Sequence, residues 1–171
     1  MKSVPLLAKF GKILMRFGKL KILIADDEAT YFNAQMISLA NSAGYHGIER
    51  IHKIDQARLR MLIDNPPDII ILDVKGVCAP DVAKDGIELA NMLVRETSIM
   101  VAITSAHKFH LTGHIANVDH IIERRNLTAV DFVDELYIIV EKYLTAKAKF
   151  YKHLSFRAGI ALARGAMQRV F

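Results

Sequence analysis

The chain has few of the residues that cross-link or interrupt a fold. Its 171 residues include one cysteine, nine glycines and four prolines. The single cysteine, Cys78, excludes an intrachain disulfide framework and suits a reducing compartment. No internal repeat or low-complexity segment is present, and the length fits one domain with appendages.

Long apolar runs are also missing. No run approaches the ~20 residues of a membrane span, and Lys9, Lys12 and Arg16 interrupt the apolar positions near the N-terminus, unlike a signal peptide. The chain is nevertheless 52% hydrophobic, which is enough for a sizeable core. We therefore expect a cytoplasmic protein.

Acidic residues are absent from both ends of the chain. Residues 1–20 carry five basic side chains, and residues 145–171 carry six. All 18 Asp and Glu lie in residues 21–144 with the other 12 Lys and Arg, so this central part has a net charge of −6. The pI of about 9.4 therefore results from the basic residues at the two ends of the chain. Such a charge asymmetry is informative about binding partners and not about the fold.

Three short apolar runs end in acidic or hydroxyl side chains. Such runs predict buried parallel strands, and open α/β sheets bind ligands beyond the carboxyl ends of their strands. Carboxylates gathered there repel one another and favour a hard cation. The runs are Leu20–Ala25 before Asp26 and Asp27, Asp68–Leu72 before Asp73, and Ile99–Ile103 before Thr104 and Ser105.

Strand and helix patterns alternate through residues 20–144. Two further strands are expected at 47–52 and 119–123, and helices at 28–43, from 55, from 85, at 107–117 and from 128. Strict alternation predicts an α/β fold, a doubly wound (βα)5 domain with five parallel strands and helices on both faces.

Several segments resemble the receiver domain of two-component response regulators. Lys21–Glu28, Pro67–Asp73 and Ile103–His107 are similar to its signature segments, and Asp85-Gly86 to the pair before its third helix. The resemblance covers about 125 of the 171 residues and implies a flavodoxin/CheY-like fold. It implies a stand-alone atypical receiver protein in phosphorelay signalling. Such a protein is not an enzyme and acts through protein–protein contacts with a histidine kinase or another signalling protein.

The resemblance also implies roles for site residues. Asp73 is the phosphoacceptor, Asp26, Asp27 and Asp73 hold Mg²⁺ with the backbone carbonyl of Lys75, and Ser105 hydrogen-bonds the phosphoryl group. This chemistry needs cations, because charge on the phosphoryl oxygens must be neutralised. The structural alternative is that Asp26 and Ser105 only cap the helices that follow them.

The fifth strand departs from the family pattern of lysine followed by proline. Alignment on the two isoleucines places Glu123 at the lysine position and Arg124 at the proline position. A glutamate there adds a fourth carboxylate and repels a phosphoryl group. A one-residue bulge would instead present Arg124, so phosphorylation of Asp73 stays in question.

The loop at 74–84 is longer than the family commonly shows. It either covers the site, binds a partner or is a tolerated surface insertion. Lys75 or Lys84 would be an alternative source of the missing cation, and only the position of Cys78 suggests a redox sensor.

The histidines allow two interpretations each. His120 stands where the family often has an aromatic switch residue, or it is a packed ring. His107, His110 and His114 share a helical face, which favours a solvated surface over a metal site because no acid or cysteine completes the set.

The basic ends predict helical extensions around a central domain. We divide the chain into a basic amphipathic helix at 1–19, a receiver-like domain at 20–146 and a basic helical extension at 147–171. The extensions would pack on their own domain, on a second protomer as a homodimer, or on an anionic membrane surface. Nucleic acid is disfavoured, because these segments are too short for a helix-turn-helix.

Two alternative functions remain at this point. Residues 26–30 distantly resemble the nucleophile motif of haloacid-dehalogenase-like phosphatases, with Asp26 as nucleophile. The basic ends would alternatively make the protein a membrane-surface scaffold.

Overall fold

The centre of the molecule is a five-stranded parallel sheet in the order β2-β1-β3-β4-β5. The computed structural model describes residues 19–28, 30–106 and 118–167, with side chains as far as Phe150. The described strands are β1 (Ile22–Ala25), β2 (Ile48–Ile51), β3 (Ile69–Asp73), β4 (Met100–Ser105) and β5 (His120–Glu123). The described helices are α2 (Ala34–Ser42), α3 (Gln56–Asp64), α4 (Gly86–Glu96) and α5 (Ala129–Met167). This architecture confirms the predicted doubly wound, flavodoxin/CheY-like fold.

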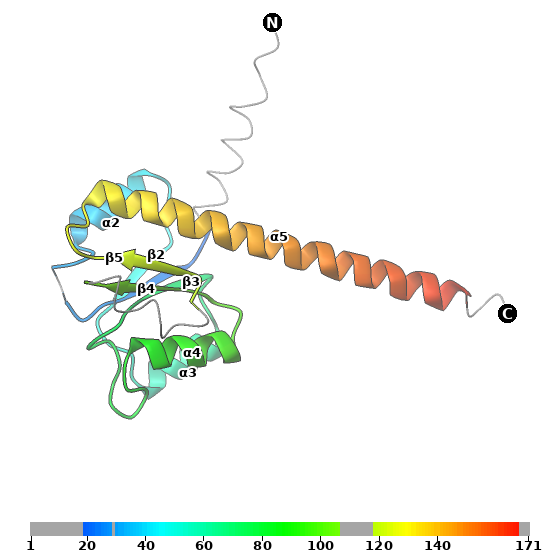
Figure 1. Cartoon of the computed structure of the whole chain (residues 1–171), viewed down its shortest axis with the longest axis horizontal. Coiled ribbons are helices and arrows are strands. Elements are labelled where there is room, and N and C mark those ends of the chain that lie inside the picture. Colours follow the sequence, from blue (N-terminus) through cyan, green and yellow to red (C-terminus); the bar gives the residue numbers. More distant parts are fainter. Residues whose placement is uncertain (1–18, 29, 107–117, 168–171) are drawn as a thin grey trace, which may run out of the picture.

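The helices cover both faces of the sheet, with α2 and α5 on one side and α3 and α4 on the other (Figure 1). Successive strand residues alternate between these two cores. Ile69 and Ile71 pack with α2 and α5, whereas Ile70 and Leu72 pack with α3 and α4. Burial on both faces explains why the strands read as continuous apolar runs.

Helix α2 begins later than the sequence predicted. It starts at Ala34 rather than near residue 28, because Asn33 accepts hydrogen bonds from the backbone N–H groups of the first helical turn. Phe32 has a left-handed backbone with φ of 44° and a fully buried ring, which packs edge-on against Phe132 of α5. The described residues between β1 and Asn33 therefore form a loop beside the carboxyl edge of the sheet.

The Asp85-Gly86 pair fits α4 closely against the end of β3. The Asp85 carboxylate caps α4, accepting from the Ile87 N–H at 3.0 Å. A Cβ on Gly86 would lie only 1.9 Å from the carbonyl oxygen of Asp73. The glycine therefore allows a backbone approach that a side chain would prevent.

Helix α5 is continuous through the expected boundary between residues 146 and 147, and it projects well beyond the sheet (Figure 1). At the amino edge of the sheet, Asp68 accepts hydrogen bonds from the Tyr143 hydroxyl and from the backbone N–H of Lys21. Lys147 lies 3.4 Å from the same carboxylate. These contacts anchor α5 to the sheet. The division of the chain into a domain that ends at residue 146 and an extension that follows it stays a prediction.

Two expected helices lie outside the described residues. They are the basic helix, apart from Lys19, and the helix at 107–117 with its three histidines. Within the described part of the chain, no helix is long and apolar enough to cross a membrane.

We expect the substitution Gly86→Ala to lower the free energy of unfolding by about 2 kcal/mol, because the added methyl group overlaps the Asp73 backbone. In an ordinary helix this change is stabilising by up to about 1 kcal/mol. The sign measured by urea unfolding is therefore diagnostic. Glu96→Ala, at the exposed end of α4, is the control.

Candidate functional site

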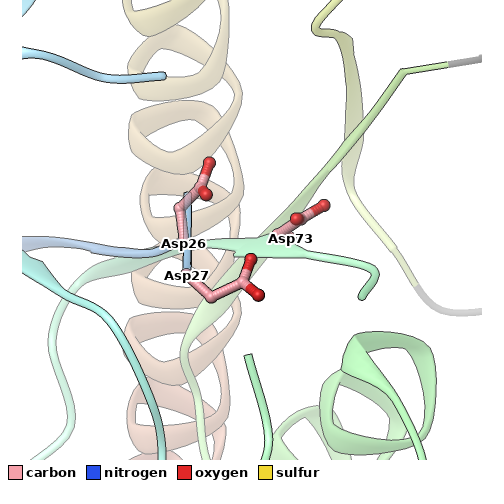
Figure 2. A group of neighbouring side chains, drawn as sticks. All are labelled: Asp26, Asp27 and Asp73. Carbon is pink, nitrogen blue, oxygen red and sulfur yellow. The ribbon is translucent and has the colours of Figure 1, made fainter. Parts of the chain in front are cut away.

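The three aspartates singled out in the sequence come together at the carboxyl edge of the sheet. Asp26 and Asp27 follow β1, and Asp73 ends the adjacent strand β3, because Ala25 pairs with Leu72. Figure 2 shows the three side chains, and one carboxylate oxygen from each lies within 4.8 Å of the other two. Asp26 and Asp73 are buried, whereas Asp27 is exposed.

The cation beside this trio is Arg124. Its Nη1 donates to Oδ2 of Asp26 at 3.2 Å and to Oδ2 of Asp73 at 2.9 Å. Its side chain is 11% exposed, and its guanidinium carbon lies 4.0 Å from the centroid of the Tyr31 ring. Its Nη2 is 4.0 Å from the carboxylate of Glu28. Arg124 therefore bridges the two buried carboxylates and stacks on the loop that follows β1.

The expectation that Glu123 adds a fourth carboxylate to the pocket is wrong. Glu123 is exposed, and the ion pairs with the trio come from Arg124. The two-residue period of the strand explains this, since Ile122 packs in the core under α2 and α5 and Arg124 returns to the same side. Ser105 pairs with Glu123 in regular register, and the Arg124 N–H donates to the Ser105 carbonyl at 2.8 Å, so no bulge is required.

The buried carboxylates are held by backbone groups as well as by Arg124. The Glu28 N–H donates to Oδ1 of Asp26 at 2.8 Å, and the Val74 N–H donates to Oδ1 of Asp73 at 2.7 Å. Burial raises the pKa of Asp73, Arg124 opposes this, and the charge of Asp26 adds to it. Burial of the Arg124 guanidinium disfavours its charged form. The neighbouring carboxylates of Asp73 and Asp26 have a larger, opposite effect, so the pKa of Arg124 is raised.

The capping alternative fails for Asp26. Its bond with the Glu28 N–H closes a local turn, and α2 begins only at Ala34. The helix that Ser105 would cap lies outside the described residues, so its capping and phosphoryl-binding roles both stay predictions. Thr104 is buried with its hydroxyl 3.5 Å from the Leu72 carbonyl, in agreement with a packing role.

The trio and its surroundings fit a hard cation. All the available donors are oxygens, and no hydrogen bond or ion pair from another described residue reaches the Asp27 carboxylate. Gly76 has φ of 73°, and a Cβ there would lie 1.8 Å from Oδ2 of Asp27, so the loop backbone closes directly on this ligand. Lys75 precedes this glycine and has an exposed side chain. Coordination by its carbonyl oxygen stays a prediction.

The loop at 74–84 packs against the segment after β2. The Ile54 N–H donates to the Val77 carbonyl at 2.8 Å, and the Ala79 N–H donates to the Ile54 carbonyl at 2.9 Å. Val77 is completely buried. Among the described residues, neither Lys75 nor Lys84 forms an ion pair with the trio, so the cation does not come from this loop.

Cys78 lies in this packed loop with a poorly reactive thiol. Burial, together with the charges of Asp85 and Glu88, raises the pKa of Cys78 to about 11. The thiol is therefore protonated at neutral pH, whereas redox-sensing cysteines have lowered pKa values.

His120 is a packed ring with two side-chain partners on α5. Its Nε2 lies 2.5 Å from a carboxylate oxygen of Glu135, and its Nδ1 lies 2.9 Å from Nζ of Lys142. A neutral ring that is protonated on Nε2 satisfies both contacts. This geometry favours a structural connection between β5 and α5, and a switching motion would have to break both bonds.

Comparison with solved structures identifies the fold as that of response-regulator receiver domains. The receiver domain of CheB from Thermotoga maritima is 17% identical with a TM-score of 0.55, and the match covers 72% of this chain and 96% of that one. The signal receiver domain of a diguanylate cyclase from Desulfovibrio desulfuricans is 18% identical with a TM-score of 0.55, covering 74% and 98%.

A third solved relative is much longer than this chain. NtrX from Brucella abortus, crystallised with ATP, is 22% identical with a TM-score of 0.57, and the match covers 80% of this chain and 29% of NtrX. No protein-family profile and no curated protein sequence matches the chain. The similarity therefore establishes the receiver fold, and the function has to be inferred from the residues of the site.

We expect Arg124→Met to lower the free energy of unfolding by about 3 kcal/mol at pH 7, because it leaves two buried carboxylates without their cation. The variant also loses the influence that lowers the pKa of Asp73. The pKa of Asp73, already raised by burial in the wild type, is then raised further. Between the two native-state pKa values the variant holds a proton that the wild type has released, so its deficit grows as the pH rises through that interval.

Urea unfolding of both proteins at pH 5 and pH 7 measures this deficit. Glu123→Ala is the matched control at the neighbouring exposed position and should change stability by less than about 0.5 kcal/mol. An equal loss in the two variants, or a deficit independent of pH, would contradict the assignment of Arg124 to the pocket.

We expect Cys78 in the folded protein to react with iodoacetamide about a hundredfold more slowly at pH 8 than in the unfolded chain, because its thiolate is suppressed by the raised pKa. Mass spectrometry of the alkylated protein over time gives the rate, with the urea-denatured chain as control. Equal rates in the two states would show that the thiol is accessible and ionised.

Proposed function

We propose that the chain is a receiver-type signalling protein that accepts a phosphoryl group on Asp73, with Arg124 as the cation in place of the family's lysine. One observation supports this most directly. A single nitrogen of Arg124 contacts both Asp26 and Asp73, so the pocket contains a positive charge, which the preferred alignment of the sequence had assigned to no residue of β5.

In this proposal, an Asp73 oxygen attacks the phosphorus of a donor. The new oxygen–phosphorus bond forms as the donor's bond to phosphorus breaks, and the released donor takes up a proton from solvent. The Val74 N–H holds one Asp73 oxygen, while Arg124 lies within reach of the other and of charge that develops beside it. When bound to the trio, Mg²⁺ would neutralise charge on the phosphoryl oxygens.

The partners follow from the receiver fold. We infer that the phosphodonor is a histidine kinase or another phosphorylated signalling protein, and that the chain transmits the signal by binding rather than by catalytic turnover. Association of the basic ends with a second protomer or with an anionic membrane surface stays a prediction from the sequence.

The phosphatase alternative is supported less well. That class needs a later lysine beside its nucleophilic aspartate. Within the described segments, no lysine contacts the trio, and the cation that does is Arg124. The solved neighbours are receiver domains.

We expect incubation with acetyl phosphate and Mg²⁺ to add one phosphoryl group to the full chain, detected by intact-mass spectrometry at neutral pH and located on Asp73 by peptide analysis. Asp73→Asn should abolish the adduct, because the amide is not a nucleophile. Asp81→Asn, in the exposed loop, is the control. An unmodified wild-type chain would overturn the proposal, and an adduct on Asp26 with continuous phosphate release would support the phosphatase.

A further inference from the structure

The Arg124 guanidinium uses the same carboxylates that a cation would need. Its Nη1 lies 3.2 Å from Oδ2 of Asp26 and 2.9 Å from Oδ2 of Asp73. Oδ1 of each carboxylate already accepts a backbone N–H. All four oxygens of the two buried members of the trio are therefore engaged, and those facing Arg124 carry its ion pairs.

A divalent ion and this guanidinium would repel each other strongly if both contacted the Asp26 carboxylate. Among the described residues, three carboxylates face one guanidinium, which leaves the trio with an excess of negative charge that still attracts a cation. A metal held by Asp26, Asp27 and Asp73 would lie beside Nη1, and the two positive centres would compete for the Oδ2 atom of Asp26. Arg124 then has to leave Asp26, while its contact with Asp73 can remain.

Arg124 has another position available within its own reach. Its guanidinium already stacks on Tyr31, and its Nη2 lies 4.0 Å from the exposed carboxylate of Glu28. Its Nε is buried without a hydrogen-bond partner among the described residues, so the present position does not satisfy the whole group. A short rotation over the Tyr31 ring would exchange Asp26 for Glu28.

We propose that Arg124 is an intramolecular competitor for the metal site, so that the Asp26 carboxylate binds either the guanidinium or a divalent cation. Metal binding releases Arg124 from Asp26 toward Glu28 and Tyr31 while its contact with Asp73 remains, and thereby couples occupancy of the pocket to the loop between β1 and α2. This inference rests on the metal site of the proposed function but does not require phosphorylation.

The test is a calorimetric titration of the full chain with Mn²⁺ and with Mg²⁺ at neutral pH and low salt, without a phosphodonor. We expect Arg124→Met to bind either ion about tenfold more tightly than the wild type, because the competing charge is gone. Arg125→Met removes an equal charge at the exposed neighbouring position and should leave the affinity unchanged within about twofold. Equal or weaker binding by Arg124→Met, or no binding by either protein at millimolar metal, would overturn the inference.

Thermal unfolding provides a second readout. Arg124→Met should gain more in melting temperature on addition of Mn²⁺ than the wild type, since the metal replaces its missing cation. If Arg124→Met does not fold even with metal, Arg124→Lys takes its place. The lysine ammonium has three donors but lies one bond short of the Nη1 position and does not stack on Tyr31 as a guanidinium does, so it should compete less strongly; intermediate affinity is expected and wild-type affinity would contradict the competition.

The outcome is independent of the acetyl phosphate experiment. A chain that binds metal more tightly without Arg124 but is never phosphorylated would retain this inference and lose the proposed function. A wild-type chain that is phosphorylated on Asp73, with no gain in metal affinity on Arg124→Met, would do the reverse.

Discussion

The carboxyl edge of the sheet depends on the burial of two carboxylates with one guanidinium. Asp26 is completely buried and Asp73 is 3% exposed, and removal of two negative charges from water is costly unless a cation accompanies them. Arg124 meets this requirement directly after β5, where the chain leaves the sheet. The pairing of β5 with β4 brings Arg124 to this edge, and its stacking on Tyr31 connects the cation to the loop after β1.

The same sheet has a second polar cluster at its opposite edge, and α5 contacts it. Asp68 lies directly before β3, at the end opposite Asp73. Its carboxylate accepts a hydrogen bond from the Tyr143 hydroxyl and lies near the Lys147 ammonium. Glu135 and Lys142 of the same helix contact His120 of β5. Helix α5 is therefore bonded to β5 and to the start of β3, so a displacement at the pocket that moved β5 would reach the projecting part of this helix.

Most of the fold could be predicted from the sequence, whereas the cation of the pocket was predicted only as the less favoured of two alternatives. Continuous apolar runs identify buried parallel strands because both faces are covered, and the aspartates that end them must meet at one edge. The preferred alignment put Glu123 at the pocket and Arg124 at the proline position. It followed the family's lysine and did not consider on which side of the sheet each residue lies. Ile122 packs under α2 and α5, and two residues later Arg124 returns to that side, a signal that the strand period contains. The late start of α2 could not be predicted, because the left-handed backbone of Phe32 depends on the packing of its ring in the folded protein.

Charge balance also explains why the arginine has a different consequence from a lysine. A lysine ammonium is a compact, strongly hydrated charge on a flexible stem, whereas the planar guanidinium is more weakly hydrated and stacks on aromatic rings. Arg124 combines the two kinds of contact, since one of its nitrogens bridges Asp26 and Asp73 while its guanidinium lies over Tyr31. Its contact with Asp26 occupies an oxygen that a metal at the trio would use, and its stacking on Tyr31 marks the alternative position that the proposed competition requires. In that proposal the pocket supplies its own cation, and a metal binds by displacing it from Asp26.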